Sequence, residues 1–268
     1  MPVLSIVTVG MNHLKYIKAL YKSLYDNGSL PAIDFEAIYV DNCSTDGSVE
    51  YIMENYPSVR IIQNDKPLGF GANNNKGVAI SKGDIIGIVN PDIVLLDDCL
   101  AVLVNYISNS QKGSIVAPQL LNPDKSIQYS VRSFITLKYF ITRIMSRGSD
   151  DSDKEDMKEY LCKDIDTNTI QPIDWAIGAS LFMNREVYQQ LGGFDERYFL
   201  YMEDEDLCLR AWKSGIPVIY NPNAKMIHNH LRGSAKLGKK TIYHIKSLLK
   251  FFYRHGINVH RDIDKGKV

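Results

Sequence analysis

Three clusters of acidic or imidazole side chains carry residue types that support bond-making chemistry. Asp92 closes the tripeptide Asn90-Pro91-Asp92, four consecutive acids occupy Glu203 to Asp206, and His228 lies in the segment MIHNH. A carboxylate at the end of a strand suits a hard divalent cation, which proteins share with substrate phosphates. A nearby histidine could complete such a site or bind a diphosphate.

The four-acid run is the candidate for proton transfer. Adjacent carboxylates repel one another, and this costs stability unless a cation or a function uses them. The residues before the run are strongly aromatic, with Phe194, Tyr198, Phe199 and Tyr201. A carboxylate that is partly desolvated by such side chains is a competent general base. The structural alternative is a solvated first turn whose acids complement the helix dipole.

The first half of the chain predicts strands that alternate with helices. Buried strands, indicated by short β-branched apolar runs, are expected at residues 4–9, 35–40, 59–63 and 85–89. Helices are expected at residues 14–25 and 49–56, and a small helix ending near Ser81 should follow a Gly/Asn-rich loop at 69–75. This alternation predicts βαβ units in a mostly parallel sheet with helices on both faces.

Polar residues follow each of the four predicted strands. They are Asn12, then Asp41, Asn42 and Asp46, then Asn64 and Asp65, and finally Asn90 and Asp92. Ligands of open parallel sheets bind beyond the carboxyl ends of the strands, so these residues predict a polar crevice at one edge. Asp and Asn are also ordinary turn and cap residues, which is the structural explanation for any one of them. The loop at 69–77 matches neither GxGxxG nor GxxxxGK[ST], which disfavours a dinucleotide enzyme and a P-loop NTPase.

The second half of the chain is less regular. A strand is expected at 114–118, a mobile loop or linker at the acidic stretch 148–156, helices at 185–191 and 204–214, and a strand at 217–220. The tail at 239–254 is basic and amphipathic. It is typical of a terminal helix packed on the domain, and it would also suit docking to anionic lipid.

Composition limits the class of protein. The 268 residues carry 31 Lys and Arg against 31 Asp and Glu, which removes the electrostatic case for nucleic acid as a partner. The four cysteines form no CxxC pair, the start lacks the features of a signal peptide, and no apolar run approaches about 20 residues. A globular protein of the cytoplasm is expected.

Taken in order, these motifs resemble the family 2 inverting glycosyltransferases, above all their rhamnosyltransferase-like branch. The resemblance covers about residues 3 to 234 and is carried by LSIVT (4–8), VDNCSTDGS (40–48), LGFGANN (68–74), VNPD (89–92), VAP (116–118), WAIGA (175–179), GGFDE (192–196) and EDEDLCLR (203–210). Each motif is weak alone, but the ordered set is specific. It implies an α/β GT-A fold with a Rossmann-like sheet. The implied domain is 1–234, with a nucleotide-sugar half at 1–110 and an acceptor half at 111–234, before a helical tail at 235–268.

The resemblance also implies roles for particular residues. Those expected to hold the nucleotide base and ribose are Thr8, Asn12, Asp41, Asn42, Ser44 and Asp46. Gly71 and Asn74 would line the ribose and diphosphate, Trp175 and Gly178 the acceptor side. Asp92 corresponds to the metal-binding acid of the DxD motif, with Asn90 in place of the first carboxylate, and His228 or His230 to a late metal or diphosphate ligand. Asp204 corresponds to the base.

The implied reaction is a single displacement that inverts configuration and uses Mg²⁺ or Mn²⁺. The donor would be dTDP-rhamnose or, behind it, a UDP-hexose. The acceptor would be a glycan or a lipid-linked glycan of surface polysaccharide synthesis, reached in the cytoplasm or from the inner face of the membrane. Two alternatives stay open: a nucleotidyltransferase, although Gly10 to His13 lacks the expected basic Gly-rich loop, and a non-catalytic module that binds nucleotide sugars.

Overall fold

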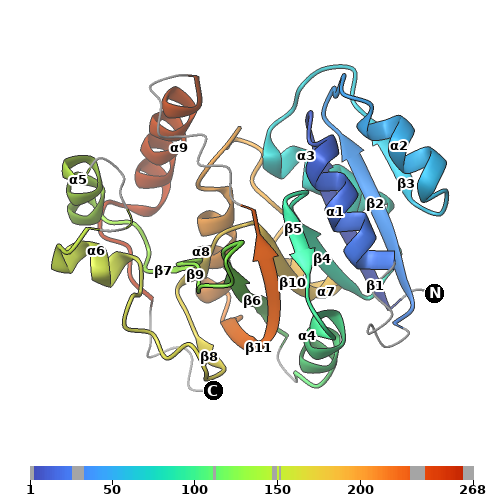
Figure 1. Ribbon diagram of the computed structural model, residues 1–268. Coiled ribbons are helices and arrows are strands. Elements are labelled where there is room, and N and C mark those ends of the chain that lie inside the picture. Colours follow the sequence, from blue (N-terminus) through green and yellow to red (C-terminus); the bar gives the residue numbers. More distant parts are fainter. Residues whose placement is uncertain are drawn as a thin grey trace.

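A computed structural model describes residues 3–25, 33–110, 113–146, 150, 152–229 and 239–261 of the chain, with side chains of the last segment from Thr241. Its centre is a mixed sheet with helices on both faces (Figure 1). The strand order is β3-β2-β1-β4-β10-β6-β11-β5, and β8 pairs with β11 at one side. His230 of the MIHNH segment lies outside the described residues.

The first four strands form the parallel half of the sheet. They are β1 (Leu4–Gly10), β2 (Phe35–Asp41), β3 (Arg60–Gln63) and β4 (Ile85–Val89), and every pairing among them is parallel. The connecting helices are α1 (Leu14–Tyr25), α2 (Ser48–Asn55) and α3 (Phe70–Ile80). The expected alternation of strands and helices is therefore confirmed.

The second half completes the sheet with strands of both directions. They are β5 (Ile93–Leu95), β6 (Ile115–Leu121), β8 (Gln171–Pro172), β10 (Ser180–Asn184) and β11 (Val218–His228). β10 runs antiparallel to both β4 and β6 and lies between them, while β11 is parallel to β6. A separate two-stranded sheet joins β7 (Val131–Arg132) to β9 (Trp175–Ala176).

The remaining helices are α4 (Cys99–Ser108), α5 (Leu137–Met145), α6 (Glu155–Tyr160), α7 (Arg185–Gln190), α8 (Glu203–Lys213) and α9 (Lys239–His255). Alternate residues of each strand serve opposite faces. Ile6 packs with α1, α2 and α4, whereas its neighbour Val7 packs with α3, α7 and α8. Each face therefore has its own apolar core. α5, α6 and α9 gather at the side away from β2, β3 and α2 (Figure 1).

Three expectations about element boundaries need correction. The Gly/Asn-rich segment at 69–75 is not a loop, because α3 begins at Phe70. The strand expected at 217–220 continues to His228, past a register shift after Asn221. Part of the acidic stretch at 148–156 is ordered, since α6 begins at Glu155, while residues 147–149 and 151 lie outside the described residues.

Tertiary packing explains why α3 forms against its low helix propensity. Gly77 lies against β1 and β2, and a Cβ there would come within 2.3 Å of Val7 Cγ1 and 3.2 Å of Val40 Cγ2. The buried amides of Asn73 and Asn74 donate to the carbonyls of Gly69 and Phe70, four residues earlier. Close packing and local hydrogen bonds thus override the preference of Gly and Asn for loops.

The packing at Gly77 gives a stability prediction. Ala in a helix interior normally stabilises by about 1 kcal/mol over Gly. We expect Gly77→Ala to lower the free energy of unfolding instead, by about 1–3 kcal/mol, because the new methyl group overpacks the contact with Val7. Urea denaturation measures this change. In a Val7→Ala background the same substitution should cost much less, and equal costs in both backgrounds would contradict this explanation.

Candidate active site

The carboxyl ends of β1, β2 and β4 lie at one edge of the sheet, as the strand pattern predicts. The three strands are parallel neighbours. Asn12 follows β1, Asp41 ends β2, and Asn90 and Asp92 follow β4. The polar residues that the sequence places after these strands therefore share one edge, where ligands of parallel sheets bind.

Polar contacts fix the two loops that follow β1 and β2. The amide N–H of Asn12 donates to Ser44 Oγ at 3.0 Å, and Asp41 Oδ2 accepts from the N–H of Ser44 at 3.0 Å. Asp46 Oδ2 accepts from the N–H of Leu14, the first residue of α1, at 2.8 Å. Asn12 has a φ of 57°, a left-handed conformation that its short polar side chain tolerates. These contacts hold the two loops together, and a role of the same residues in nucleotide binding stays a prediction.

A cluster of amides joins β2, β3 and α3 at the same edge. Asn42 Oδ1 accepts from the N–H of Leu68 at 2.8 Å, and its Nδ2 donates to the carbonyl of Leu68 at 3.1 Å. Asn64 Nδ2 donates to Asn73 Oδ1 at 2.5 Å, and Lys76 Nζ donates to Asn64 Oδ1 at 2.8 Å. The cluster fixes the start of α3 and brings the positive charge of Lys76 to this edge.

Three further residues of the predicted nucleotide site are buried. Thr8 lies within β1, and Gly71 and Asn74 lie within α3. A Cβ on Gly71 would come within 2.8 Å of Phe194 Cβ, so glycine is needed for this packing. Packing thus explains the glycine at position 71, and contact of the three residues with ribose or diphosphate stays a prediction.

Asp92 and His228 face each other across the end of β11. His228 Nε2 lies 3.5 Å from Asp92 Oδ1. The other ring nitrogen, Nδ1, is 2.6 Å from Gln128 Oε1. Because an amide oxygen only accepts, this contact places a proton on Nδ1 and directs Nε2 toward Asp92. The carbonyl of Asp92 also accepts from the amide N–H of Asn229 at 2.8 Å, which fastens β11 to this turn.

The Asp92–His228 pair fits a divalent cation. Asp92 Oδ1 is buried and has no hydrogen-bond partner among the described residues. A buried carboxylate oxygen without a partner is costly unless a charge compensates it. Carboxylate oxygen and imidazole nitrogen are suitable ligands for Mn²⁺, and the carboxylate suits Mg²⁺. The described residues contain no group of three His, Cys, Asp or Glu side chains that could hold a metal, so other ligands would come from substrate and water.

A backbone connection brings Asp92 and the four-acid run to the same place. The amide N–H of Asn90 donates to the carbonyl of Ala179 at 2.9 Å. The N–H of the preceding residue, Gly178, donates to Asp204 Oδ2 at 2.7 Å. Two adjacent residues therefore join the end of β4 to the start of α8. A Cβ on Gly178 would lie 3.2 Å from Asp204 Cβ, so a side chain there would crowd the carboxylate.

Asp204 is the one member of the acidic run that keeps partial exposure. Burial raises the pKa of its carboxyl, whereas hydrogen bonds from the N–H groups of Gly178 and Glu205 and the charge of Arg132 oppose this rise. Its Oδ1 accepts from the N–H of Glu205 at 2.9 Å. A carboxyl group held this way is positioned, reachable and more basic than a free aspartate, which are the properties of a general base.

The other three acids are buried in different surroundings. Burial raises the pKa of Glu203 to about 8, and its Oε2 has no hydrogen-bond partner among the described residues. Burial also raises the pKa of Glu205, whose Oε1 accepts from the N–H of Ile135 at 2.5 Å. Asp206 is paired instead: its carboxylate lies 2.7 Å from Arg210 Nε and 2.7 Å from His255 Nε2.

Backbone strain accompanies this arrangement. Tyr201 and Met202 have φ values of 71° and 70°, directly before α8. Two consecutive side-chain-bearing residues in the left-handed region are unfavourable and persist only where the surroundings impose them. Phe70 donates its amide N–H to the carbonyl of Phe199 at 3.0 Å, so the start of α3 supports the same segment. The strained turn sets where α8, and with it Asp204, begins.

Two residues near Asp204 complete its surroundings. Trp175 is buried in β9, and its indole Nε1 donates to the carbonyl of Ser133 at 2.8 Å. Its predicted acceptor-side role stays a prediction. Arg132, which lies opposite Trp175 in the small sheet, contributes the positive charge that acts on Asp204.

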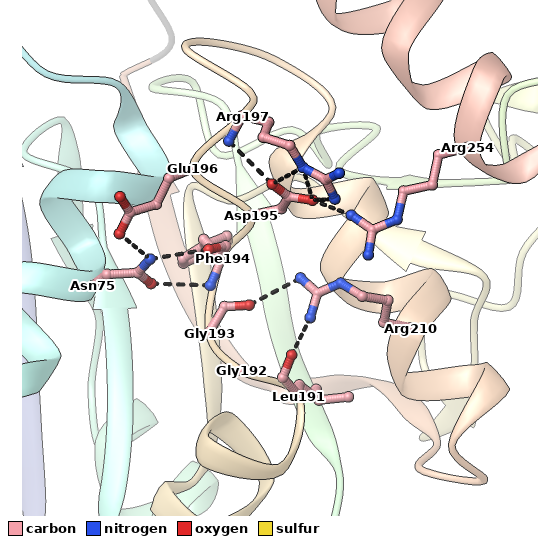
Figure 2. Close-up of a pocket in the computed structure, with 10 residues that line it drawn as sticks. All are labelled: Asn75, Leu191, Gly192, Gly193, Phe194, Asp195, Glu196, Arg197, Arg210 and Arg254. Atoms are coloured by element: carbon pink, nitrogen blue, oxygen red, sulfur yellow. Dashed lines mark hydrogen bonds and ion pairs between the residues drawn. The ribbon is translucent and has the colours of Figure 1, made fainter.

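A polar cavity of about 390 Å³ is lined by the GGFDE motif together with residues of α3, α8 and α9 (Figure 2). The three arginines of its lining all have partners. Asp195 pairs with Arg197 and Arg254, and Arg210 donates to the carbonyls of Leu191 and Gly193. Asn75 of α3 donates to the carbonyl of Phe194 at 2.9 Å. The motif therefore clamps α3, α8 and α9 together, which gives it a structural role.

Sequence reasoning missed Gln128 and Arg132. Gln128 orients His228 from a position 100 residues earlier, and Arg132 acts on Asp204 from β7. Both lie in the irregular region that follows β6, where no periodicity places side chains. The sequence therefore gave no signal by which these two residues could be found.

Comparison with known proteins agrees with this geometry. The family model described as "Glycosyl transferase family 2" matches residues 5–191. The rhamnosyltransferase WbbL of Escherichia coli is 28% identical over 270 residues, which is 97% of this chain and 96% of that protein. The N-acetylglucosaminyl-diphospho-decaprenol L-rhamnosyltransferase of Mycobacterium tuberculosis is 27% identical over 81% of this chain and 75% of its own length.

Solved structures resemble the fold at lower identity. The mannosyltransferase PcManGT of Pyrobaculum calidifontis, in complex with GDP-Man and Mn²⁺, has a TM-score of 0.62 at 16% identity over 97% of this chain. TarS of S. aureus, residues 1–349, has a TM-score of 0.57 at 16% identity over 84% of this chain. The chain spans 66% and 60% of those two solved chains. This likeness shows the GT-A fold that the motifs imply.

Since the family model covers most of the chain, this protein belongs to glycosyl transferase family 2. The expected family and fold are confirmed. The match favours a glycosyltransferase over the nucleotidyltransferase alternative.

The pKa of Glu203 leads to a prediction about pH and stability. A carboxyl whose pKa rises from 4.5 to about 8 on folding keeps its proton in the folded chain and loses it on unfolding between these values. The folded state then binds more protons, so this group makes stability fall as pH rises from about 4.5 to 8. In Glu203→Gln the fall should be smaller by at least about 1 kcal/mol.

Urea denaturation near pH 5 and pH 8.5 measures this slope. Glu54→Gln, which changes an exposed carboxyl of α2, is the matched control and should keep the slope of the parent protein. A Glu203→Gln slope equal to the parent's would show that Glu203 does not hold the proton.

Proposed function

We propose that this protein is an inverting, metal-dependent glycosyltransferase with Asp204 as its base. One observation carries the proposal: Gly178 and Ala179 join Asp204 to the turn that carries Asp92, through hydrogen bonds of 2.7 Å and 2.9 Å. A leaving-group site and a proton acceptor must face one anomeric carbon from opposite sides. A short backbone bridge between the two supports that arrangement.

Asp92 and His228 are the residues that would hold Mg²⁺ or Mn²⁺, with His228 oriented by Gln128. A bound divalent cation supplies neutralisation of the charge that develops on a diphosphate leaving group. Asn90 stands where the first acid of a DxD motif would be, so only one carboxylate of this motif is available. His230, the alternative late ligand, lies outside the described residues.

Asp204 would perform the proton transfer. Its carboxylate takes the proton of an acceptor hydroxyl as the hydroxyl oxygen attacks the anomeric carbon, and the bond to the nucleoside diphosphate breaks on the opposite face. Configuration at that carbon therefore inverts. Partial burial makes Asp204 a stronger base, while the N–H groups of Gly178 and Glu205 keep it aimed. Glu203, neutral at pH 7, adds no repelling charge beside it.

For the substrates, our first proposal is transfer of rhamnose from dTDP-rhamnose, with UDP-sugars second. Two relatives named as rhamnosyltransferases, one of them at nearly full length, support this order. A glycan or lipid-linked glycan is the proposed acceptor, and the name of the mycobacterial relative includes a decaprenol diphosphate. A cytoplasmic reaction, with contact on the inner face of the membrane, stays part of this proposal.

The test of donor identity is release of nucleoside diphosphate from a panel of dTDP-, UDP- and GDP-sugars, with and without Mn²⁺. Selective Mn²⁺-dependent release from dTDP-rhamnose supports the proposal. Selective release from a UDP- or GDP-sugar would keep the enzyme class and replace the donor. Binding of a nucleotide without turnover of any donor or acceptor would favour a non-catalytic module.

Replacement of the base gives the sharpest prediction. We expect Asp204→Asn to lower the transfer rate by about 10²–10⁴-fold, because an amide cannot accept the hydroxyl proton. Donor binding, read as the thermal shift with nucleoside diphosphate and Mn²⁺, should persist. Asp84→Asn, an exposed acid before β4, should leave the rate unchanged. Near-normal turnover of Asp204→Asn would remove Asp204 from the role of base.

Metal binding is tested separately from turnover. In Asp92→Asn and in His228→Ala, we expect loss of the extra thermal stabilisation that Mn²⁺ gives with a nucleoside diphosphate. Gln128→Leu should weaken apparent Mn²⁺ affinity by about 10–100-fold, as is typical when the residue that orients a ligand is lost. Asp97→Asn, on the exposed part of the same segment, is the control. Full Mn²⁺ dependence in His228→Ala would exclude it as a ligand.

A further inference from the structure

A row of apolar side chains on α5 is exposed to solvent. It consists of Leu137, Ile141, Ile144 and Met145, which are 40% to 68% exposed. Their spacing of four, three and one residues places them on one face of the helix. The helix contacts the rest of the protein through its other faces, where Thr142 is buried and Phe140 is half-buried. This face has no described partner within the chain.

α9 carries two apolar faces. Leu248 and Phe251 are buried in the core. A second set, on the opposite side of the helix, is exposed and comprises Ile242, Ile245, Leu249 and Tyr253, with exposed fractions from 48% to 95%. A helix that only caps a domain needs one apolar face. The second face is surplus to the packing of α9.

The two helices lie next to each other (Figure 1). The amide N–H of Leu137, at the start of α5, donates to the carbonyl of Ile257, just beyond α9, at 2.9 Å. Further along, His244 of α9 lies near Arg143 of α5. Burial lowers the pKa of the His244 imidazole to about 4, and the positive charge of Arg143 is the second cause. α5 and α9 are therefore neighbours, and we call their exposed apolar faces together the α5/α9 surface.

Charge identifies the kind of partner. Residues 239–255 contain five Lys or Arg and no Asp or Glu, in a chain whose total charges cancel. Arg254 pairs with Asp195, so the four lysines carry the charge argument. Lys246 is exposed and lies at the edge of the apolar row of α9. The basic residues of α5 are neutralised, since Lys138 pairs with Asp156 at 2.7 Å and Arg143 with Asp150 at 3.5 Å. α5 thus contributes apolar area, and α9 contributes apolar area together with positive charge.

We propose that the α5/α9 surface docks on an anionic lipid bilayer, with both helices lying in the headgroup region. Apolar side chains bordered by basic residues, on a helix that carries no acid, are the chemistry that binds such an interface. Among the described residues no helix is long and apolar enough to cross a membrane. A second copy of this chain would bring the same positive charges of α9 together, which disfavours it as the occupant.

The α5/α9 surface is mechanically joined to the candidate active site. Ser247 Oγ donates to the carbonyl of Leu200 at 2.9 Å, and Lys250 Nζ donates to that of Arg197 at 2.6 Å. His255 pairs with Asp206, two residues beyond Asp204. α9 thus supports the strained segment that leads into α8. A docked α9 would hold the proton-accepting helix against the membrane, where a lipid-linked acceptor is anchored; this consequence, unlike the docking, rests on the proposed function.

The test is flotation of the full chain with vesicles of phosphatidylcholine alone or with 30% phosphatidylglycerol. We expect binding to the anionic vesicles only, weakened by salt. Leu249→Glu and Ile141→Glu, one on each helix, should each reduce the bound fraction at least tenfold, and Lys246→Gln at least twofold. Met53→Glu and Lys66→Gln change exposed residues far from this surface and should bind like the parent chain.

Nucleoside diphosphate binding by thermal shift confirms that each variant is folded and separates this proposal from the proposed reaction. No enrichment on anionic vesicles, or binding that survives both Leu249→Glu and Ile141→Glu, would overturn the proposal. So would a stable dimer in light scattering that Leu249→Glu dissociates, since a second copy would then cover this surface. Loss of binding in Leu249→Glu alone would restrict docking to α9 and overturn the composite surface.

Discussion

The site depends on one constraint, the antiparallel insertion of β10 between β4 and β6. β10 begins where β4 ends, because Ser180 lies opposite Val89 in this pairing. The two residues before β10 are therefore delivered to the edge where parallel strands present their carboxyl ends. There the carbonyl of Ala179 accepts from Asn90 and the N–H of Gly178 donates to Asp204. Without this insertion, the acids of the second half would have no defined relation to Asp92.

Environment, and not sequence position, separates the four consecutive acids. Asp206 is neutralised by Arg210 and His255, and burial pushes Glu203 and Glu205 toward the protonated form. Only Asp204 combines partial exposure with two backbone N–H donors. A run that would repel itself in water is thus divided into two acids that burial pushes toward the protonated form, one paired acid, and one reachable acid held by backbone donors. Carboxylates of equal chemistry acquire different roles in this way.

The sequence predicted the parallel half of the fold and the edge where its polar residues gather, because strand periodicity and the direction of βαβ units determine both. Its motifs also predicted roles for Asp92 and Asp204, and these roles stay predictions. It did not predict α3 from Phe70, since that helix depends on glycines that fit against Val7 and Phe194. It could not find Gln128 or Arg132, whose partners lie 100 and 72 residues away in the chain. Local patterns predict elements, whereas contacts across irregular segments are decided only by the assembled fold.

Two different requirements meet in α9: support of the segment before α8, and an exposed apolar face. The segment before α8 is strained at Tyr201 and Met202, and strain persists only where neighbouring groups over-determine the backbone. α9 supplies such groups through Ser247 and Lys250 on one side, while its other side exposes apolar residues that a small soluble domain would normally hide. A helix that only supports the strained segment could have a polar outer face. A helix that only binds lipid could be loosely attached to the rest of the protein. α9 is both firmly packed and apolar on its outer side. In the proposed docking, the same helix would therefore support the segment before Asp204 and bind the lipid surface.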